Sequence, residues 1–133
     1  MKTFYLAGKV SGNEAAIISA AEEIESRGHT VLEKWFLAGR LPKPYLSHMD
    51  VSRPAAEAMI TASRMCDVFV LFPTDDIFGA AVELGTALSS TQTNPDKVVA
   101  IMNPLDVRQS VFYAYPGVLA LQQITDLQQF DWY

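Results

Sequence analysis

The chain has 133 residues, of which 50% are hydrophobic and 19% are charged, and its formal net charge at pH 7 is −5. This length fits one domain, spanning residues 1–133, with a hydrophobic core of its own. The acidic balance argues against a long nucleic acid as partner, because proteins that bind one usually carry a basic surface. A membrane is not expected either, because no stretch reaches the roughly 18 apolar residues of a membrane span.

Cysteine usage and the N-terminus indicate where the protein works. Cys66 is the single cysteine, which excludes an internal disulfide and fits the reducing cytoplasm. The sequence runs from Met1 directly into a strand pattern, so we expect no signal peptide and a cytoplasmic protein. It contains no cluster of Cys and His with metal-ligand spacing, and we expect neither a metal nor another cofactor.

The beginning of the chain predicts a strand, a helix and a second strand. Residues 3–7 are a short β-prone run that ends at Gly8, and a helix is expected over residues 13–27 with Asn13 as its N-cap. Apolar residues at helical spacing mark its core side: Ala16, Ile17, Ala20, Ala21 and Ile24. A glycine ends this helix, and residues 29–35 predict the second strand.

Residues 36–54 contain three prolines and are too irregular for one element, which is typical of a lid or a binding loop. Aromatic side chains here either stack on a planar base or close the edge of the core: Trp35, Phe36, Tyr45 and His48. A helix is then expected over residues 54–65, with Pro54 in the favoured first turn and Ser52 as the candidate cap.

The middle of the chain predicts a ligand-binding edge. Val68–Phe72 is a run of five apolar residues closed by a proline, which predicts a strand buried on both faces. A polar loop with two carboxylates follows, and then a helix of small residues that begins at Gly79. Strand, loop and helix in this order place the loop at the carboxyl edge of a sheet, where open α/β folds bind ligands.

The rest of the sequence adds strands over residues 97–102 and 117–121, an ambiguous short helix over residues 107–115, and a terminal helical turn over residues 125–130 that Thr125 or Asp126 would cap. Five strands alternating with helices predict a three-layer α/β fold. We expect a five-stranded parallel sheet with right-handed crossovers and helices on both faces, in a Rossmann-like or flavodoxin-like order.

Glu83 is the best catalytic candidate, because it is the only ionisable residue between Ile77 and Leu88 and has small apolar neighbours. The positive end of the helix dipole favours a carboxylate by a few tenths to about 1 kcal/mol. We therefore expect Glu83 to be ionised and able to act as a nucleophile or to stabilise a cation. An ordinary solvated helix residue is the alternative. The neighbouring Gly79 and Gly85 would let a substrate or the first strand approach the backbone.

Three segments together resemble the nucleoside 2-deoxyribosyltransferase family, which includes related N-glycosidases of deoxynucleoside monophosphates. They are Phe4-Tyr5-Leu6-Ala7-Gly8, Asp67-Val68-Phe69-Val70-Leu71 and Gly79-Ala80-Ala81-Val82-Glu83-Leu84-Gly85-Thr86-Ala87-Leu88. The likeness spans nearly the whole chain in element order, and the Glu-Leu-Gly-x-Ala block is moderately specific. It implies cleavage or transfer at the N-glycosidic bond of a small (deoxy)nucleoside or nucleotide, through a glutamate nucleophile and a covalent glycosyl-enzyme intermediate.

The resemblance also assigns roles to individual residues. It makes Glu83 the nucleophile, Tyr5 the residue whose hydroxyl contacts that glutamate or the sugar, and Gly8 a point where the backbone faces the substrate. Ser110 matches a position that reaches into the neighbouring subunit's site, which implies a homodimer or larger homo-oligomer with shared active sites. Phosphate donors for a nucleotide substrate would be Lys9, Ser11 and Ser110, although Lys9 fits an exposed loop charge equally well.

Two positions depart from the family pattern. Met59 stands where an aspartate usually helps to bind or protonate the leaving base, and Ile77 stands where Asp or Ser is usual. Asp76 lies one residue before Ile77 and Asp75 lies two before it, so a slightly longer loop would present either carboxylate to the sugar. The departures also support a second class of function, a nucleotide-binding or sensing module of the same fold that has lost turnover. A scaffold protein without a ligand is a third class.

Overall fold

The computed structural model describes the backbone of all 133 residues and every side chain except those of Val10 and Ser11. Five parallel strands form one sheet in the order β2-β1-β3-β4-β5. Their bounds are Thr3–Gly8 for β1, Thr30–Val31 for β2, Val68–Phe72 for β3, Val98–Met102 for β4 and Leu119–Leu121 for β5. This is the flavodoxin-like order, so the predicted fold class is confirmed.

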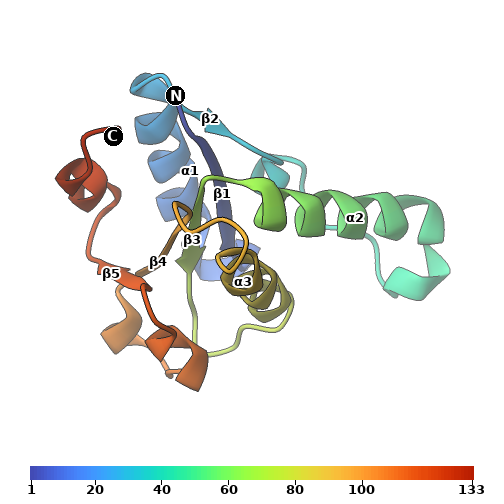
Figure 1. Ribbon diagram of the computed structural model, residues 1–133. Helices are drawn as coiled ribbons and strands as arrows, with labels where there is room; N and C mark the ends of the chain where they lie inside the picture. The colour runs from blue at the N-terminus through green and yellow to red at the C-terminus, as the bar shows by residue number, and fades with distance from the viewer.

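Three α-helices cover the two faces of the sheet (Figure 1). Helix α1 (Val10–Ser26) packs on one face, and α2 (Met49–Met65) and α3 (Gly79–Ser90) pack on the other. Short 3-10 helices fill the connections: η1 (Trp35–Leu37), η2 (Tyr45–Ser47), η3 (Pro104–Asp106), η4 (Val111–Ala114) and η5 (Ile124–Gln129). No helix among the 133 described residues is both long and apolar enough to cross a membrane.

The pleat of the central strands divides the core into two layers. Phe4 and Leu6 of β1 point towards α1, whereas Tyr5 and Ala7 point towards α2 and α3. All five residues of β3 are buried because helices cover the sheet on both sides. Parallel pairing aligns Tyr5 with Phe69 of β3, which puts Tyr5 in the middle of the sheet beneath the helices of the second layer.

Helix α1 begins three residues earlier than predicted, and Asn13 is therefore not its cap. The Asn13 side-chain amide instead donates to the backbone oxygens of Phe72, at 3.2 Å, and Pro73, at 3.4 Å, tying α1 to the end of β3. The predicted core side is confirmed for Ile17, Ala20, Ala21 and Ile24, which are buried. Ala16 is exposed, so its inclusion was wrong.

The region between β1 and β3 differs most from the sequence prediction. Strand β2 has two residues instead of seven, because the chain leaves the sheet edge and Trp35 turns inward to donate from its indole N–H to the oxygen of Leu6 at 2.7 Å. Helix α2 begins at Met49, which places Pro54 inside it. Ser52 lies in the helix and donates to the oxygen of Tyr45 at 2.9 Å, so it is not the cap.

The C-terminal elements follow the prediction with shorter bounds. The ambiguous segment contains one short 3-10 helix, η4, and β5 begins two residues later than expected. The last helical turn, η5, has Gln123 as its N-cap, and Asp126 completes a capping box by accepting from the backbone N–H of Gln123. The N-cap is therefore Gln123, and the prediction of Thr125 or Asp126 as the cap was wrong, although the Asp126 side chain completes the capping box.

Lys97, at the start of β4, fixes the end of α2 to the sheet. Its side chain is only 7% exposed, and its ammonium donates to the backbone oxygens of Ser63 at 2.6 Å and Arg64 at 2.9 Å. These carbonyls belong to the last turn of α2, where a cation is favoured. Burial lowers the pKa of the Lys97 ammonium. The contact therefore holds α2 over the face of the sheet that contains Tyr5.

We expect Lys97→Met to lower the free energy of unfolding by about 2–3 kcal/mol, because two buried carbonyls lose their charged donor. Urea unfolding measures this change. The matched control is Lys34→Met, which removes an exposed ion pair with Glu25 and should cost less than about 1 kcal/mol. Equal losses in the two variants would contradict the anchoring role of Lys97.

Candidate active site

The structure brings Tyr5 and Glu83 together, although 78 positions separate them in the sequence. Tyr5 lies in β1 and is fully buried, and Glu83 is the fifth residue of α3. The phenolic hydroxyl of Tyr5 donates a hydrogen bond to Oε2 of Glu83. The helix and the strand are both packed into the same apolar layer, and Glu83 itself is half-buried beside it.

Burial controls the ionisation of this pair. It raises the pKa of Glu83 from 4.5 to about 7, while the hydrogen bond from Tyr5 acts in the opposite direction. Burial, followed by the Glu83 charge, also raises the pKa of Tyr5 well above its usual range. Burial therefore opposes the ionisation of Glu83 that the sequence analysis expects. The helix dipole stabilises the carboxylate by at most about 1 kcal/mol, which lowers the pKa by less than one unit. The effect of burial on the pKa of Glu83 is larger.

Apolar and aromatic side chains pack against the layer that contains Tyr5. Met59 of α2 and Ile77 of the β3–α3 loop, the two departures from the family pattern, are partly buried against the core layer that contains Tyr5. Trp35, Tyr113 and Tyr115 pack against the same layer. Among the described side chains, Tyr5 is the one hydrogen-bond partner of Glu83. The two positions at which the family pattern has acids are therefore apolar here and pack against the layer of Tyr5.

Asp75 and Asp76 interact with groups other than Tyr5 and Glu83. The exposed carboxylate of Asp76 pairs with the ammonium of Lys9 at 3.1 Å, which links the loops after β3 and β1. Asp75 accepts from the backbone N–H of Arg108 at 2.7 Å, which links the first of these loops to the one after β4. These contacts tie three loops together at the carboxyl edge of the sheet.

The remaining predicted site residues have local roles in the structure. A side chain on Gly8 would meet the oxygen of Phe72 at 3.0 Å, so β1 needs a glycine to lie against β3. Gly79 and Gly85 have nothing within 4 Å of an added Cβ, so the first strand does not approach them. Ser110 is the N-cap of η4 and accepts from the N–H of Phe112 at 3.2 Å. The Ser11 side chain lies outside the described part of the chain.

Glu33 is a residue that the sequence analysis missed. It follows β2 with a left-handed φ of 45°, which is uncommon for any residue other than glycine. Its charge contributes to the raised pKa of Tyr5, which places it near the pair. The available signal was its position: an acid directly after a predicted strand, at the edge where the other strands also end.

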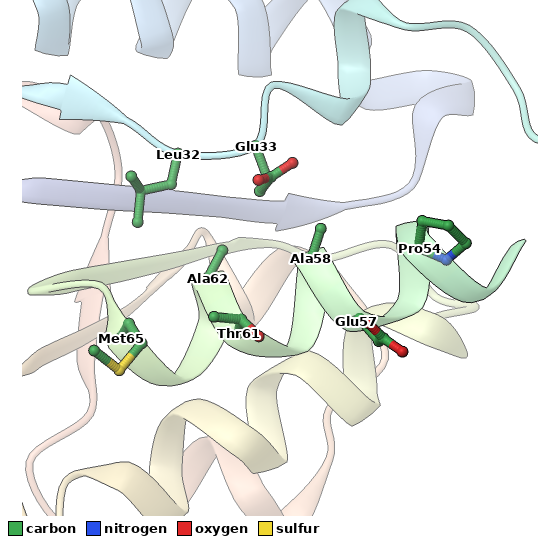
Figure 2. Close-up of a pocket in the computed structure, with 8 residues that line it drawn as sticks. All are labelled: Leu32, Glu33, Pro54, Glu57, Ala58, Thr61, Ala62 and Met65. Atoms are coloured by element: carbon green, nitrogen blue, oxygen red, sulfur yellow. The ribbon is translucent and has the colours of Figure 1, made fainter. Parts of the chain in front are cut away.

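A groove of about 490 Å³ lies between the residues after β2 and helix α2 (Figure 2). Figure 2 shows Glu33 on one side of it and the Ala58 and Ala62 side chains of α2 on the other. Glu57 also lines the groove, and no lysine or arginine does. Leu32 and Ala62 belong both to this lining and to the apolar layer of Tyr5, so the groove adjoins the layer that holds the candidate site.

Comparisons with known proteins support the fold. No protein-family model matches the sequence, and no curated protein matches it. Among solved structures, the CMP N-glycosidase BcmB of Clostridium botulinum aligns over 99% of this chain and 100% of its own, with 17% identity and a TM-score of 0.60. A 2-deoxyribosyltransferase from Bacillus psychrosaccharolyticus aligns over 97% and 92%, with 20% identity and a TM-score of 0.61.

The chain therefore has the α/β fold of proteins that act on nucleosides and nucleotides. The family resemblance predicted from the sequence is confirmed at the level of the fold. At 17–20% identity these matches do not extend to the activity, and the site has to be interpreted from its own residues.

The raised pKa of Glu83 predicts a specific pH dependence of stability. The folded protein keeps the Glu83 proton up to about pH 7, whereas the unfolded chain loses it near pH 4.5. The contribution of the Glu83 proton to the free energy of unfolding is therefore complete below pH 4.5 and is lost as the pH rises through 7. We expect the free energy of unfolding of Glu83→Gln, relative to the parent, to rise by roughly 3 kcal/mol between pH 4.5 and pH 8.

Urea unfolding of both proteins across this pH range measures the difference, in which the contributions of all other groups cancel. Glu22→Gln on the exposed side of α1 is the control for the loss of a helical carboxyl group. A difference that stays constant with pH for Glu83→Gln would mean that Glu83 is not a buried acid.

Proposed function

We propose that the protein cleaves or transfers the N-glycosidic bond of a small (deoxy)nucleoside or nucleotide, with Glu83 as nucleophile. One observation carries the proposal: a half-buried carboxyl group bonded to the hydroxyl of a tyrosine in the apolar layer, in a fold that enzymes of this chemistry share. A carboxylate in this position can attack a sugar carbon that develops cationic character, and a low-dielectric surrounding strengthens that attraction.

The reaction has two steps in this proposal. The Glu83 carboxylate attacks the anomeric carbon as the base departs, which gives a glycosyl ester. Water then opens the ester in a hydrolase, or a second base does so in a transferase. The hydrogen bond from Tyr5 fixes one carboxyl oxygen and leaves the other free to attack. Because Glu83 titrates near pH 7, the nucleophilic form grows as the pH rises through neutrality.

A homodimer or larger homo-oligomer with shared sites is part of the proposal. Support comes from the segment after Ser110, where Val111 is 78% exposed and Phe112 is 63% exposed. Phe78, at the start of α3 and five residues before Glu83, is 90% exposed. Exposed apolar side chains of this size favour contact with another protein surface. We propose a cytoplasmic enzyme without a cofactor, as the sequence predicts.

The alternative function is a nucleotide-binding or sensing module without turnover. The observation that favours it is the apolar pair Met59 and Ile77, together with the outward contacts of Asp75 and Asp76. Such a module would bind its ligand whether or not position 83 carries a nucleophile.

We expect the protein to release base from members of a nucleoside and nucleoside monophosphate panel, and Glu83→Gln to lower that rate at least about 10³-fold. Chromatography of the free base measures release, with and without a second base as acceptor. The rate should rise with pH through about 7, because only the Glu83 carboxylate attacks. Tyr5→Phe should move this rise to higher pH, since it removes the hydrogen bond that lowers the Glu83 pKa.

Two controls accompany this experiment. Glu22→Gln changes an exposed acid on the opposite face of the sheet and should leave the rate unchanged. Asp76→Asn tests whether the Asp76 carboxylate takes part in the reaction after its ion pair with Lys9 breaks. If no member of the panel loses its base, while calorimetry finds a nucleotide that binds the parent and Glu83→Gln equally well, the sensing module replaces the enzyme.

A further inference from the structure

The apolar wall around Glu83 restricts which base can leave. When a neutral nucleoside loses its base, the departing ring nitrogen keeps the electron pair of the broken bond and needs a proton. A positioned acid that supplies this proton accelerates such reactions typically by 10²–10⁴-fold. The leaving group therefore decides whether a site requires two acids or one.

Among the described side chains, no second acid is hydrogen-bonded to Glu83 or to Tyr5, and Glu33, which lies near the pair, is exposed and lines the neighbouring groove. Met59 and Ile77 are apolar, Asp76 is paired with Lys9, and Asp75 accepts from the backbone at Arg108. The Tyr5 hydroxyl already donates to Glu83. Glu83 itself cannot serve, because the proton that it would donate is the one it must lose in order to attack.

A base that is already cationic needs no proton. In a pyridinium or N7-alkylated purine nucleoside the ring carries a positive charge, and it leaves as a neutral molecule when the bond to the sugar breaks. Building on the proposed function, we infer that the natural substrate is an N-glycoside with a cationic base of this kind. Departure of the base would then require no proton donor besides the groups already present.

The charges near the site are complementary to such a substrate. Glu33 and Glu57 both line the groove that adjoins the Tyr5 layer, and no basic residue lines that groove. The chain as a whole carries a net charge of −5. Trp35 packs against the same apolar layer, and an indole attracts a cation through its ring face. A positive base also favours the ionised, nucleophilic form of Glu83.

The reaction balances without an additional acid. An oxygen of the Glu83 carboxylate forms a bond to the anomeric carbon, and the bond from this carbon to the ring nitrogen breaks. The nitrogen keeps the electron pair, so the cationic base leaves neutral. Water then adds to the anomeric carbon, the ester bond breaks to restore the carboxylate, and one proton passes to solvent. The net change is cationic glycoside plus water to neutral base, free sugar and a proton.

The test compares nucleosides that differ in charge but hardly in shape. Guanosine and 7-methylguanosine form the matched pair, and nicotinamide riboside and uridine form a second pair. Each release rate is divided by the spontaneous rate of the same compound, because cationic nucleosides are intrinsically less stable. We expect this enhancement to be at least about 100-fold larger for the cationic member of at least one pair. Only the neutral member needs a proton donor, and a positioned donor contributes about this factor. The difference between pairs then identifies pyridinium or alkylpurine as the class.

A gain-of-function variant provides an independent readout. Met59→Asp would place a carboxyl group in the wall of the site, and Met59→Asn is its uncharged control of similar size. The preference for 7-methylguanosine over guanosine should fall at least about tenfold in Met59→Asp and remain in Met59→Asn. Thermal unfolding checks that both variants fold, and the comparison of substrates on the parent stands without them.

The outcomes separate this inference from the proposed function. Release of cationic bases that depends on Glu83, with little release of neutral ones, supports both. Equal enhancement for neutral and cationic nucleosides overturns the inference and leaves the proposed function intact. No release of any base overturns both.

Discussion

The burial of the Glu83 carboxyl beside the Tyr5 hydroxyl is the constraint on which the rest of the site depends. A carboxyl group in an apolar layer is costly to ionise, and a single hydrogen bond offsets only part of that cost. The arrangement persists because β1 is paired within the sheet and α3 packs on the same sheet. The positions of Tyr5 and Glu83 therefore do not depend on their hydrogen bond alone. A surface glutamate would be ionised at neutral pH, and water would screen its charge from any ligand.

The parallel sheet creates this geometry through its register. β1 lies between β2 and β3, so the side chain of Tyr5 points into the centre of one face. The close contact of Gly8 with Phe72 keeps β1 against β3, and Lys97 holds α2 in place above the same face. The loops that follow β1, β3 and β4 are then joined by the contacts of Asp75 and Asp76 at the carboxyl edge. In this view, the two aspartates organise the edge around the site.

Some of this architecture could be predicted because the signal was local. The run Val68–Phe72 could form only a buried strand, and the isolated Glu83 in its small-residue helix indicated the site. The start of α2 was missed because Pro54 is typical of a first turn, whereas the helix extends five residues before it. Strand β2 is short because the tertiary bond of Trp35 to Leu6 draws the chain away from the sheet. The contacts of Asp76 and the position of Glu33 depend on residues far away in the sequence, which no local pattern reports.

The central claim is that Glu83 forms a covalent bond to the sugar, and mass spectrometry of a trapped intermediate tests it most directly. Fluorine at the 2′ carbon slows a step with an oxocarbenium-like transition state, so 2′-fluoro analogues of 7-methylguanosine and nicotinamide riboside should accumulate the glycosyl ester. We predict a mass increase equal to one fluorosugar, located on the peptide that contains Glu83 and missing from Glu83→Gln. Release of base from these analogues without any adduct, or with the adduct on another residue, would contradict the account.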